Sequence, residues 1–240
     1  MIVVGNGLLG SHFRKLDACS DHVIFASGVS NSSSTSIDDF NREAALLKTW
    51  LKKSHTLIYF STCSIDDPLL FAKPYVIHKL AMEKLVMSSK SGFVIRVPQV
   101  VGNCANKNTL INFLVDKIYH NEPFILQAGS VRNLIDIDDL VSLTMFLINE
   151  KYPAGCYSLA MPIEYEVSRI VSCIEKHLNV ESLHTLKAGS PYSYPKSLFV
   201  EQAIKYGVIR CGEDYLDTII AKYFSNSQWF EIFSRSIKEK

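Results

Sequence analysis

Tyr75 and Lys79 are the pair of residues whose types and spacing point most directly to acid–base chemistry. They are four positions apart in a predicted helix over residues 75–88, so their side chains lie on one face of that helix. An ammonium fixed beside a phenol lowers the pKa of the phenol from about 10 toward the range useful for proton transfer. The same spacing also arises by chance, as an exposed aromatic ring beside a solvated lysine.

Two hydroxyl side chains, Ser61 and Thr62, precede this helix at the end of the apolar run 56–60, "TLIYF". That run is predicted to be a buried strand. Open α/β sheets bind their ligands at the carboxyl ends of their strands. The hydroxyl pair therefore favours a proton-transfer site over a chance Tyr/Lys pair.

A glycine-rich segment, "GNGLLG" at residues 5–10, lies between a short apolar run and a helical pattern. Glycines in this context permit a tight turn, close approach of a pyrophosphate to backbone N–H groups, and close packing of helix on strand. The alternative is a tight turn without a ligand. An acidic residue about 20 residues further on usually binds the adenosine ribose, but residues 25–28 contain none.

Strands and helices alternate over the first hundred residues, which predicts a parallel sheet flanked by helices. The predicted strands are 1–4, 22–26, 56–60 and 93–97, and the predicted helices are 8–16, 38–53 and 75–88. The polar segment 27–36 is predicted to be a loop. After residue 102 we expect helices near 110–120 and 138–149, strands near 124–127 and 156–159, and further helices beyond them.

Composition excludes several classes of protein. The 240 residues, 48% of them hydrophobic, can bury a sizeable core, and a net charge of +1 without a basic run argues against binding to nucleic acid or to an anionic membrane. The six cysteines are widely scattered, and neither they nor the histidines show zinc-ligand spacing, so no metal site is expected. The absence of a long apolar stretch and of a leader pattern leads us to expect a cytoplasmic protein.

The motifs occur in the order in which one known family carries them. The chain resembles the extended short-chain dehydrogenase/reductases, also called the NAD-dependent epimerase/dehydratase family of nucleotide-sugar enzymes. The resemblance covers most of the chain, and the matching segments are "GNGLLG", "HVIFASG", "FSTCSI", "YVIHK", "IRVPQVVG", "VRNLIDIDDLV" and "GCYSLAMPIEYEVSRIV".

The resemblance implies an α/β fold, a doubly wound, Rossmann-like parallel sheet with a small C-terminal substrate lobe. Residues 1–103 and 130–160 would form the nucleotide-binding core, and residues 104–129 and 161–240 the lobe. The family's second and third strands are missing, because residues 11–61 leave room for only one strand and one helix before the Ser/Thr strand. Without the family, the three strands before Ser61 could equally be an intact first half of the sheet.

The resemblance also implies the roles of individual residues. Thr62 would hydrogen-bond the reacting sugar carbonyl or alcohol, Tyr75 would be the general acid/base, and Lys79 would bind the nicotinamide ribose and hold Tyr75 ready. Gln99 and Arg132 would contact substrate, with Arg132 on its diphosphate. The residues expected to bind NAD or NADP are Gly5, Asn6, Gly7, Leu8, Leu9, Gly10, Ala26, Ser27, Gly28, Ser61, Tyr75, Lys79 and Pro98.

Departures from the family pattern limit what can be carried over. The missing strands remove the residue that chooses between NAD and NADP, and Gln99, Val101, Asn133 and Asp136 replace the usual Asn, Tyr, Asp and His. These changes leave the sugar and the nucleotide undefined. The family's four-helix dimer interface, with two helices from each copy, would here be formed by residues 38–53 and 75–88, so a homodimer is expected.

Two functions remain open after the sequence. The first is an NAD(P)-dependent reductase or epimerase of a nucleotide sugar for surface polysaccharide. The second is a degenerate relative that binds a sugar nucleotide or a partner protein without turnover. The family's 4,6-dehydratases carry Asp-Glu directly after the catalytic Thr; Cys63 and Ser64 stand there, so dehydration is excluded. Asp66 and Asp67 follow closely and are expected to point into a turn.

Overall fold

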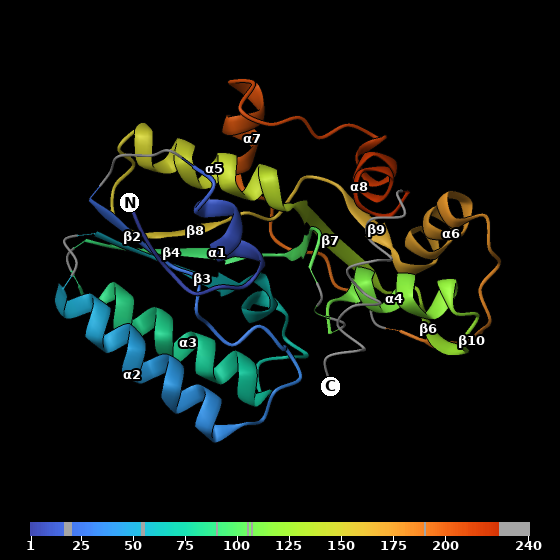
Figure 1. Ribbon diagram of the computed structural model, residues 1–240, viewed down its shortest axis with the longest axis horizontal. Helices are drawn as coiled ribbons and strands as arrows, with labels where there is room; N and C mark the ends of the chain where they lie inside the picture. Colours follow the sequence, from blue (N-terminus) through green and yellow to red (C-terminus); the bar gives the residue numbers. More distant parts are fainter. Residues whose placement is uncertain are drawn as a thin grey trace. The chain divides into compact units, whose positions relative to one another are not determined.

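The computed structural model describes residues 1–16, 21–53, 56–89, 91–104, 106, 108–189 and 191–225 (Figure 1). They form two compact units. The first contains Met1–Pro98, Ile137–Ala160 and Tyr194–Ile209, and the second contains Gln99–Asp136, Met161–Ser193 and the chain from Arg210 onward. The sequence-based division groups residues 99–103, 130–136 and 194–209 differently, and its residues 226–240 lie outside the described residues. We keep a cofactor core and a substrate lobe as a proposal.

The first unit is built on a five-stranded sheet in the order β1-β2-β3-β4-β8. Its strands are β1 (Ile2–Val4), β2 (His22–Phe25), β3 (Thr56–Thr62), β4 (Gly92–Val97) and β8 (Cys156–Ser158). All neighbouring strands run parallel. The inner strands are nearly continuous runs of buried side chains, as expected where both faces of a sheet are covered. The predicted Rossmann-like α/β class is confirmed.

Helices cover both faces of this sheet (Figure 1). They are α1 (Leu8–Phe13), α2 (Ile37–Lys53), α3 (Pro74–Met87) and α5 (Ile137–Asn149). Phe60 of β3 packs on Phe13 of α1 with ring centroids 5.5 Å apart. Its neighbour Tyr59 packs with Leu47 of α2 and Met82 of α3. Because successive strand residues point to opposite faces, α1 lies on one face and α2 and α3 lie on the other.

The strand order decides between the two interpretations of residues 11–61. An intact first half would place β1 inside the sheet, with the strand order reversing beside it. Among the described residues β1 is instead the edge strand, and the order does not reverse. The connections from β1 to β2 and from β2 to β3 move across the sheet in the same direction. Their helices, α1 and α2, nevertheless lie on opposite faces of the sheet. The two crossovers therefore have opposite hands, a rare arrangement that fits the predicted loss of two strands.

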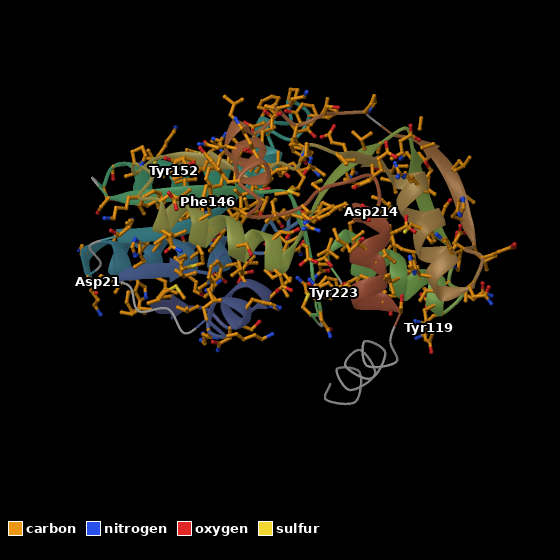
Figure 2. All side chains as sticks on the ribbon, turned by 90° about the horizontal axis from the view of Figure 1, so that it is seen from above. Asp21, Tyr119, Phe146, Tyr152, Asp214 and Tyr223 are labelled. Carbon is orange, nitrogen blue, oxygen red and sulfur yellow. The ribbon has the colours of Figure 1, made fainter. Side chains whose placement is uncertain are left out.

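An aromatic cluster attaches a late segment of the chain to the first unit. The helix α7 (Leu198–Lys205) contributes Phe199, whose ring lies 5.9 Å from that of Phe146 on α5 and 5.2 Å from that of Tyr152. Phe146 and Tyr152 are themselves neighbours, 5.8 Å apart (Figure 2). This packing explains why residues 194–209 belong with the sheet.

The second unit combines two small sheets with three helices. Its elements are β5 (Gln99–Val101), α4 (Leu110–Tyr119), β6 (Phe124–Ala128), β7 (Val131–Asp136), β9 (Glu164–Glu166), α6 (Val167–Leu178), β10 (His184–Ala188) and α8 (Tyr215–Phe224). Strand β6 pairs with β10, and β7 lies between β5 and β9. The buried Asp136 carboxylate accepts hydrogen bonds from Lys222 at 2.7 Å and Tyr223 at 2.8 Å, which attach α8 to β7. None of the described helices in either unit has the length and hydropathy to cross a membrane.

Candidate active site

Thr62, Tyr75 and Lys79 come together in the first unit, at the carboxyl end of β3 and the start of α3. The Tyr75 side chain is hydrogen-bonded to Thr62, and Lys79 Nζ lies 5.8 Å from the centroid of the Tyr75 ring. Thr62 Oγ1 also accepts a hydrogen bond from Ser64 N at 3.1 Å. None of the three is more than 8% exposed. An exposed tyrosine beside a solvated lysine is therefore excluded.

A buried carboxylate that the sequence analysis did not single out, Glu43 of α2, is a direct partner of Lys79. Lys79 Nζ donates to Glu43 Oε1 at 3.0 Å, and the two side chains are 3% and 0% exposed. Glu43 also accepts from Tyr59 OH at 2.6 Å, from Val29 N at 2.6 Å and from His78 Nε2 at 3.0 Å. A signal was present in the sequence, because Glu43 falls at helical spacing between the apolar residues Phe40 and Leu47.

Glu43 and Lys79 form a buried ion pair. Burial raises the pKa of Glu43, but hydrogen bonds from His78 and Tyr59 and the charge of Lys79 bring it down to about 2. Burial lowers the pKa of Lys79, and the Glu43 carboxylate opposes that effect. Each charge is thus compensated by the other, with both side chains almost fully buried.

The pKa of Tyr75 moves opposite to the sequence-based expectation. Burial raises it, the Glu43 charge raises it further, and the hydrogen bond with Thr62 offsets only part of this. The expected lowering by Lys79 does not occur because the ammonium is bonded to Glu43 and Tyr59 and not to the Tyr75 hydroxyl. At neutral pH Tyr75 is therefore a neutral phenol.

Lys79 has acceptors for all three of its N–H donors within the protein. Besides Glu43 and Tyr59, both at 3.0 Å, Nζ reaches the carbonyl oxygen of Phe60 at 3.5 Å. A contact with a ribose hydroxyl would have to displace one of these acceptors, and the long bond to Phe60 is the weakest. A Cβ on Gly28 would lie 2.7 Å from Lys79 Nζ and 3.0 Å from Glu43 Oε1, so only glycine fits against the pair.

The glycine-rich turn is tightly packed at two of its three glycines. Gly5 has φ +115°, and a Cβ there would lie 2.2 Å from the carbonyl oxygen of Ala26. A Cβ on Gly10 would lie 2.2 Å from the carbonyl oxygen of Gly5. At Gly7, which precedes α1, a Cβ would meet nothing within 4 Å. Two glycines thus pack the turn, and the third leaves open space beside it, where a pyrophosphate can approach the backbone.

Two exposed arginines flank this turn and the residues after β2. Arg14 Nη2 donates to Asn6 Oδ1 at 2.7 Å and to the carbonyl oxygen of Gly5. Arg42 Nη1 lies 3.3 Å from both Ser27 O and Ser27 Oγ. Both guanidinium groups carry positive charge to the part of the first unit that is expected to bind a diphosphate. Sequence reasoning missed both residues.

The remaining predicted site residues divide between the two units. The buried Ser61 Oγ has no hydrogen-bond partner among the described residues, so it is available to a ligand. Pro98 ends the first of the three segments that make up the first unit. Gln99 and Arg132 belong to the second unit, where Arg132 donates to Val131 O at 2.7 Å and to Gln127 Oε1 at 3.4 Å. Within the first unit the structure brings the predicted residues together; the substrate roles of Gln99 and Arg132 stay predictions.

The two positions after Thr62 lack an acid and a base. Burial raises the pKa of the Cys63 thiol to about 12. Asp66 does not point into a turn as expected but accepts a hydrogen bond from Arg96 Nη1 at 2.8 Å. Arg96 also binds both carboxylate oxygens of Glu83 on α3, at 3.0 and 2.8 Å. Asp66 is thus bound in an ion-pair network with Arg96 and Glu83, and the exclusion of dehydration stays a prediction.

One group of side chains of metal-ligand types lies close together in the described part of the chain. Cys173 and His177 of α6 and Asp217 of α8 have potential ligand atoms within 4.8 Å of one another. The two α6 residues are four apart, a spacing that the sequence analysis did not weigh. Asp217 Oδ1 already forms an ion pair with Lys176 at 3.0 Å. Because the Lys176 ammonium already pairs with the Asp217 carboxylate, we assign no metal to this group.

Comparison with known proteins identifies the fold. No protein-family model matches the sequence, and no curated protein matches it. The structure, however, matches extended short-chain dehydrogenase/reductases that are nucleotide-sugar epimerases, dehydratases and reductases, at low sequence identity and over nearly the whole chain. The predicted resemblance is confirmed at the level of the fold.

Three solved structures illustrate the match. RMD from Pseudomonas aeruginosa, complexed with NADPH, has 15% identity and a TM-score of 0.74, over 98% of this chain and 99% of its own. The dTDP-glucose 4,6-dehydratase from Bacillus anthracis, in complex with NAD, has 15% identity and a TM-score of 0.68, over 94% and 79%. The UDP-glucuronic acid 4-epimerase from Bacillus cereus, with a fluorinated UDP-sugar and NAD, has 15% identity and a TM-score of 0.68, over 96% and 79%.

Proposed function

We propose that this protein is an NAD(P)-dependent oxidoreductase of a nucleotide sugar, a reductase or an epimerase, working in the cytoplasm in surface polysaccharide synthesis. The observation that carries the proposal is the buried cluster of Thr62, Tyr75 and Lys79 at the carboxyl end of β3, in a fold shared with enzymes of this class. A bound nicotinamide would supply the hydride chemistry. The turn at residues 5–10 and the buried Ser61 hydroxyl, which has no partner among the described residues, fit such a group.

The chain's own residues would handle the proton. The Thr62 hydroxyl, which is hydrogen-bonded to Tyr75, would orient the reacting sugar oxygen beside the phenol. The pKa of Tyr75, raised by burial, keeps the phenol protonated at neutral pH, which is the state that can donate a proton to a carbonyl oxygen. This favours reduction of a ketosugar over an epimerase, which must first remove a proton from an alcohol.

A degenerate binding protein is the second candidate, and two observations favour it. The sheet order β1-β2-β3-β4-β8 has no reversal, so the first unit lacks the switch point at which doubly wound sheets bind ligands. Lys79 has all its donors bonded within the protein. A direct measurement of cofactor binding separates this candidate from the enzyme.

The test is a fluorescence titration of the protein with NADH and with NADPH. We expect both to bind, with dissociation constants within about tenfold of each other, or ~1.4 kcal/mol, because residues 25–28 contain no acidic residue to select NADH. Arg14→Ala and Arg42→Ala should each weaken both complexes. A preference above a hundredfold would show that an unidentified residue reads the 2′ position, and no binding of either at millimolar concentration would favour the degenerate protein.

A homodimer is expected from the paired helices α2 and α3. They lie together on one face of the sheet (Figure 1), and α3 exposes Ile77 at 54% and Met87 at 45%. A second copy related by a two-fold axis would bury such side chains in a four-helix interface. Light scattering at micromolar concentration should give twice the 27.0 kDa mass of the chain, and Ile77→Glu should shift it toward the monomer. A monomeric wild-type protein would contradict the prediction.

A further inference from the structure

The Glu43 carboxylate is held by groups from several parts of the first unit. Val29 N comes from the loop after β2, Tyr59 from β3, and His78 and Lys79 from α3. His78 is itself fixed, because its ring stacks on Phe40 with centroids 4.4 Å apart. A carboxylate that accepts hydrogen bonds from this many donors is held in one position, and it holds the donor groups in place in turn.

Lys79 depends on this carboxylate more than on any other group. Its Nζ is bonded to Glu43 and Tyr59, and Tyr59 OH in turn donates to Glu43. The three groups form a closed triangle of hydrogen bonds. Removing one partner of a buried ion pair leaves an uncompensated charge, which is strongly unfavourable. An ammonium 3% exposed would therefore not stay charged and in place without Glu43.

We propose that Glu43 is a positioning residue of the active site: together with Tyr59 it fixes the Lys79 ammonium 5.8 Å from the centroid of the Tyr75 ring. From there the Lys79 ammonium lies beside the ring of the proposed proton donor. The inference rests on the proposed function only in taking Tyr75 as the proton donor. The contacts of Glu43 with Lys79 stand independently of that function.

The first test measures the ionisation of Lys79 without cofactor or substrate. NMR of protein labelled with 13C-lysine, with the Lys79 signal assigned by its loss in Lys79→Met, gives the titration of this ammonium. Glu43→Gln should move that titration down by about one pH unit or more, since burial then acts without the opposing carboxylate. The charged or titratable groups that face Lys79 are Glu43 and Arg42 from α2, Tyr59 from β3, and Tyr75 and Glu83 from α3.

Two further variants distinguish the loss of the Glu43 charge from a general effect of substitution on folding. Glu83→Gln removes another buried carboxylate, 6% exposed, that is bonded to Arg96 and not to Lys79. It should shift the Lys79 titration far less than Glu43→Gln does. Glu43→Asp keeps the charge but withdraws it by one methylene, so it should give a smaller downward shift, and it replaces Glu43→Gln if that variant does not fold.

The second test is the pH dependence of turnover. In Glu43→Gln the alkaline limb of the kcat profile should move to lower pH along with the Lys79 titration, whereas Glu83→Gln should leave the limb in place. Equal Lys79 titrations in wild type and in both Glu43 variants would overturn the proposal, as would an unmoved alkaline limb. If the wild-type protein shows no binding and no turnover, the proposed function fails, and the NMR titration still decides whether Glu43 maintains the ammonium.

Discussion

Tyr75→Phe is expected to lower turnover by about 10² to 10⁴, the usual contribution of a positioned acid or base. The substitution removes the phenolic oxygen that is bonded to Thr62 and leaves the ring in its buried place. Affinity for the dinucleotide should change little, because the glycine-rich turn and Ser61 are untouched. The measurement is the steady-state oxidation of NADPH with a 4-keto-6-deoxy nucleotide sugar, alongside a fluorescence titration of the cofactor.

Tyr157→Phe is the matched control for this prediction. Its hydroxyl donates to Pro153 O at 2.6 Å in the aromatic cluster of the first unit and contacts none of the proposed catalytic residues. Its removal should leave turnover unchanged. If Tyr75→Phe were as active as the wild type, the phenol would have no part in proton transfer, and the proposed role of Tyr75 would fail.

The proton-transfer cluster could be predicted from sequence because its members are local. Tyr75 and Lys79 are one helical turn apart, and Thr62 ends the strand that precedes their helix. Helical spacing and the rule that ligands bind at strand ends therefore bring them together before any tertiary contact is known. Their burial was not predictable at that level, since a helix presents a Tyr/Lys pair equally well to solvent.

Glu43 illustrates what local reasoning cannot supply. Its contact with Lys79 requires that α2 pack beside α3 on one face of the sheet, which depends on the strand order β2-β3-β4. The strands β5, β9 and β10 were missed for a related reason, and β7 was missed although its residues 133–136 are buried. β5 and β9 are three residues long, and every residue of β10 is exposed, so none of these three has the buried run or clean alternation that predicts a strand. Each forms by pairing with a strand distant in sequence.

The shortening of the sheet was predictable only through the family resemblance. Periodicity identified β1, β2 and β3 but could not order them, and an intact first half would have produced the same pattern. The sequence contains no signal that shows which strand pairs with β1. In the structure, the position of β1 at the edge of the sheet and the opposite hands of the first two crossovers supply this information. A dinucleotide bound to this shortened sheet would have to be held mainly by the turn that follows β1.

Glycine substitutions in that turn should separate folding from binding. Gly10→Ala places a methyl group 2.2 Å from the backbone carbonyl of Gly5, where neither partner can move without opening the turn. Overpacking of this kind costs about 3 kcal/mol, which for a chain of this size lowers Tm by roughly 6–12 °C. Thermal unfolding followed by circular dichroism measures this loss.

Gly7→Ala is the matched substitution at the open end of the same turn. Gly7 has φ −73° and ψ −169°, a conformation that alanine adopts readily, and its new methyl group meets no protein atom within 4 Å. The loss of the glycine N-cap should cost no more than about 1 kcal/mol. If a pyrophosphate approaches the backbone in this space, the methyl group should weaken NADH and NADPH binding about tenfold or more, since close approach is what glycine permits there. A Gly7→Ala protein that binds both dinucleotides as tightly as the wild type would show that the cofactor lies elsewhere, whereas an unchanged Tm for Gly10→Ala would contradict the tight packing of the turn itself.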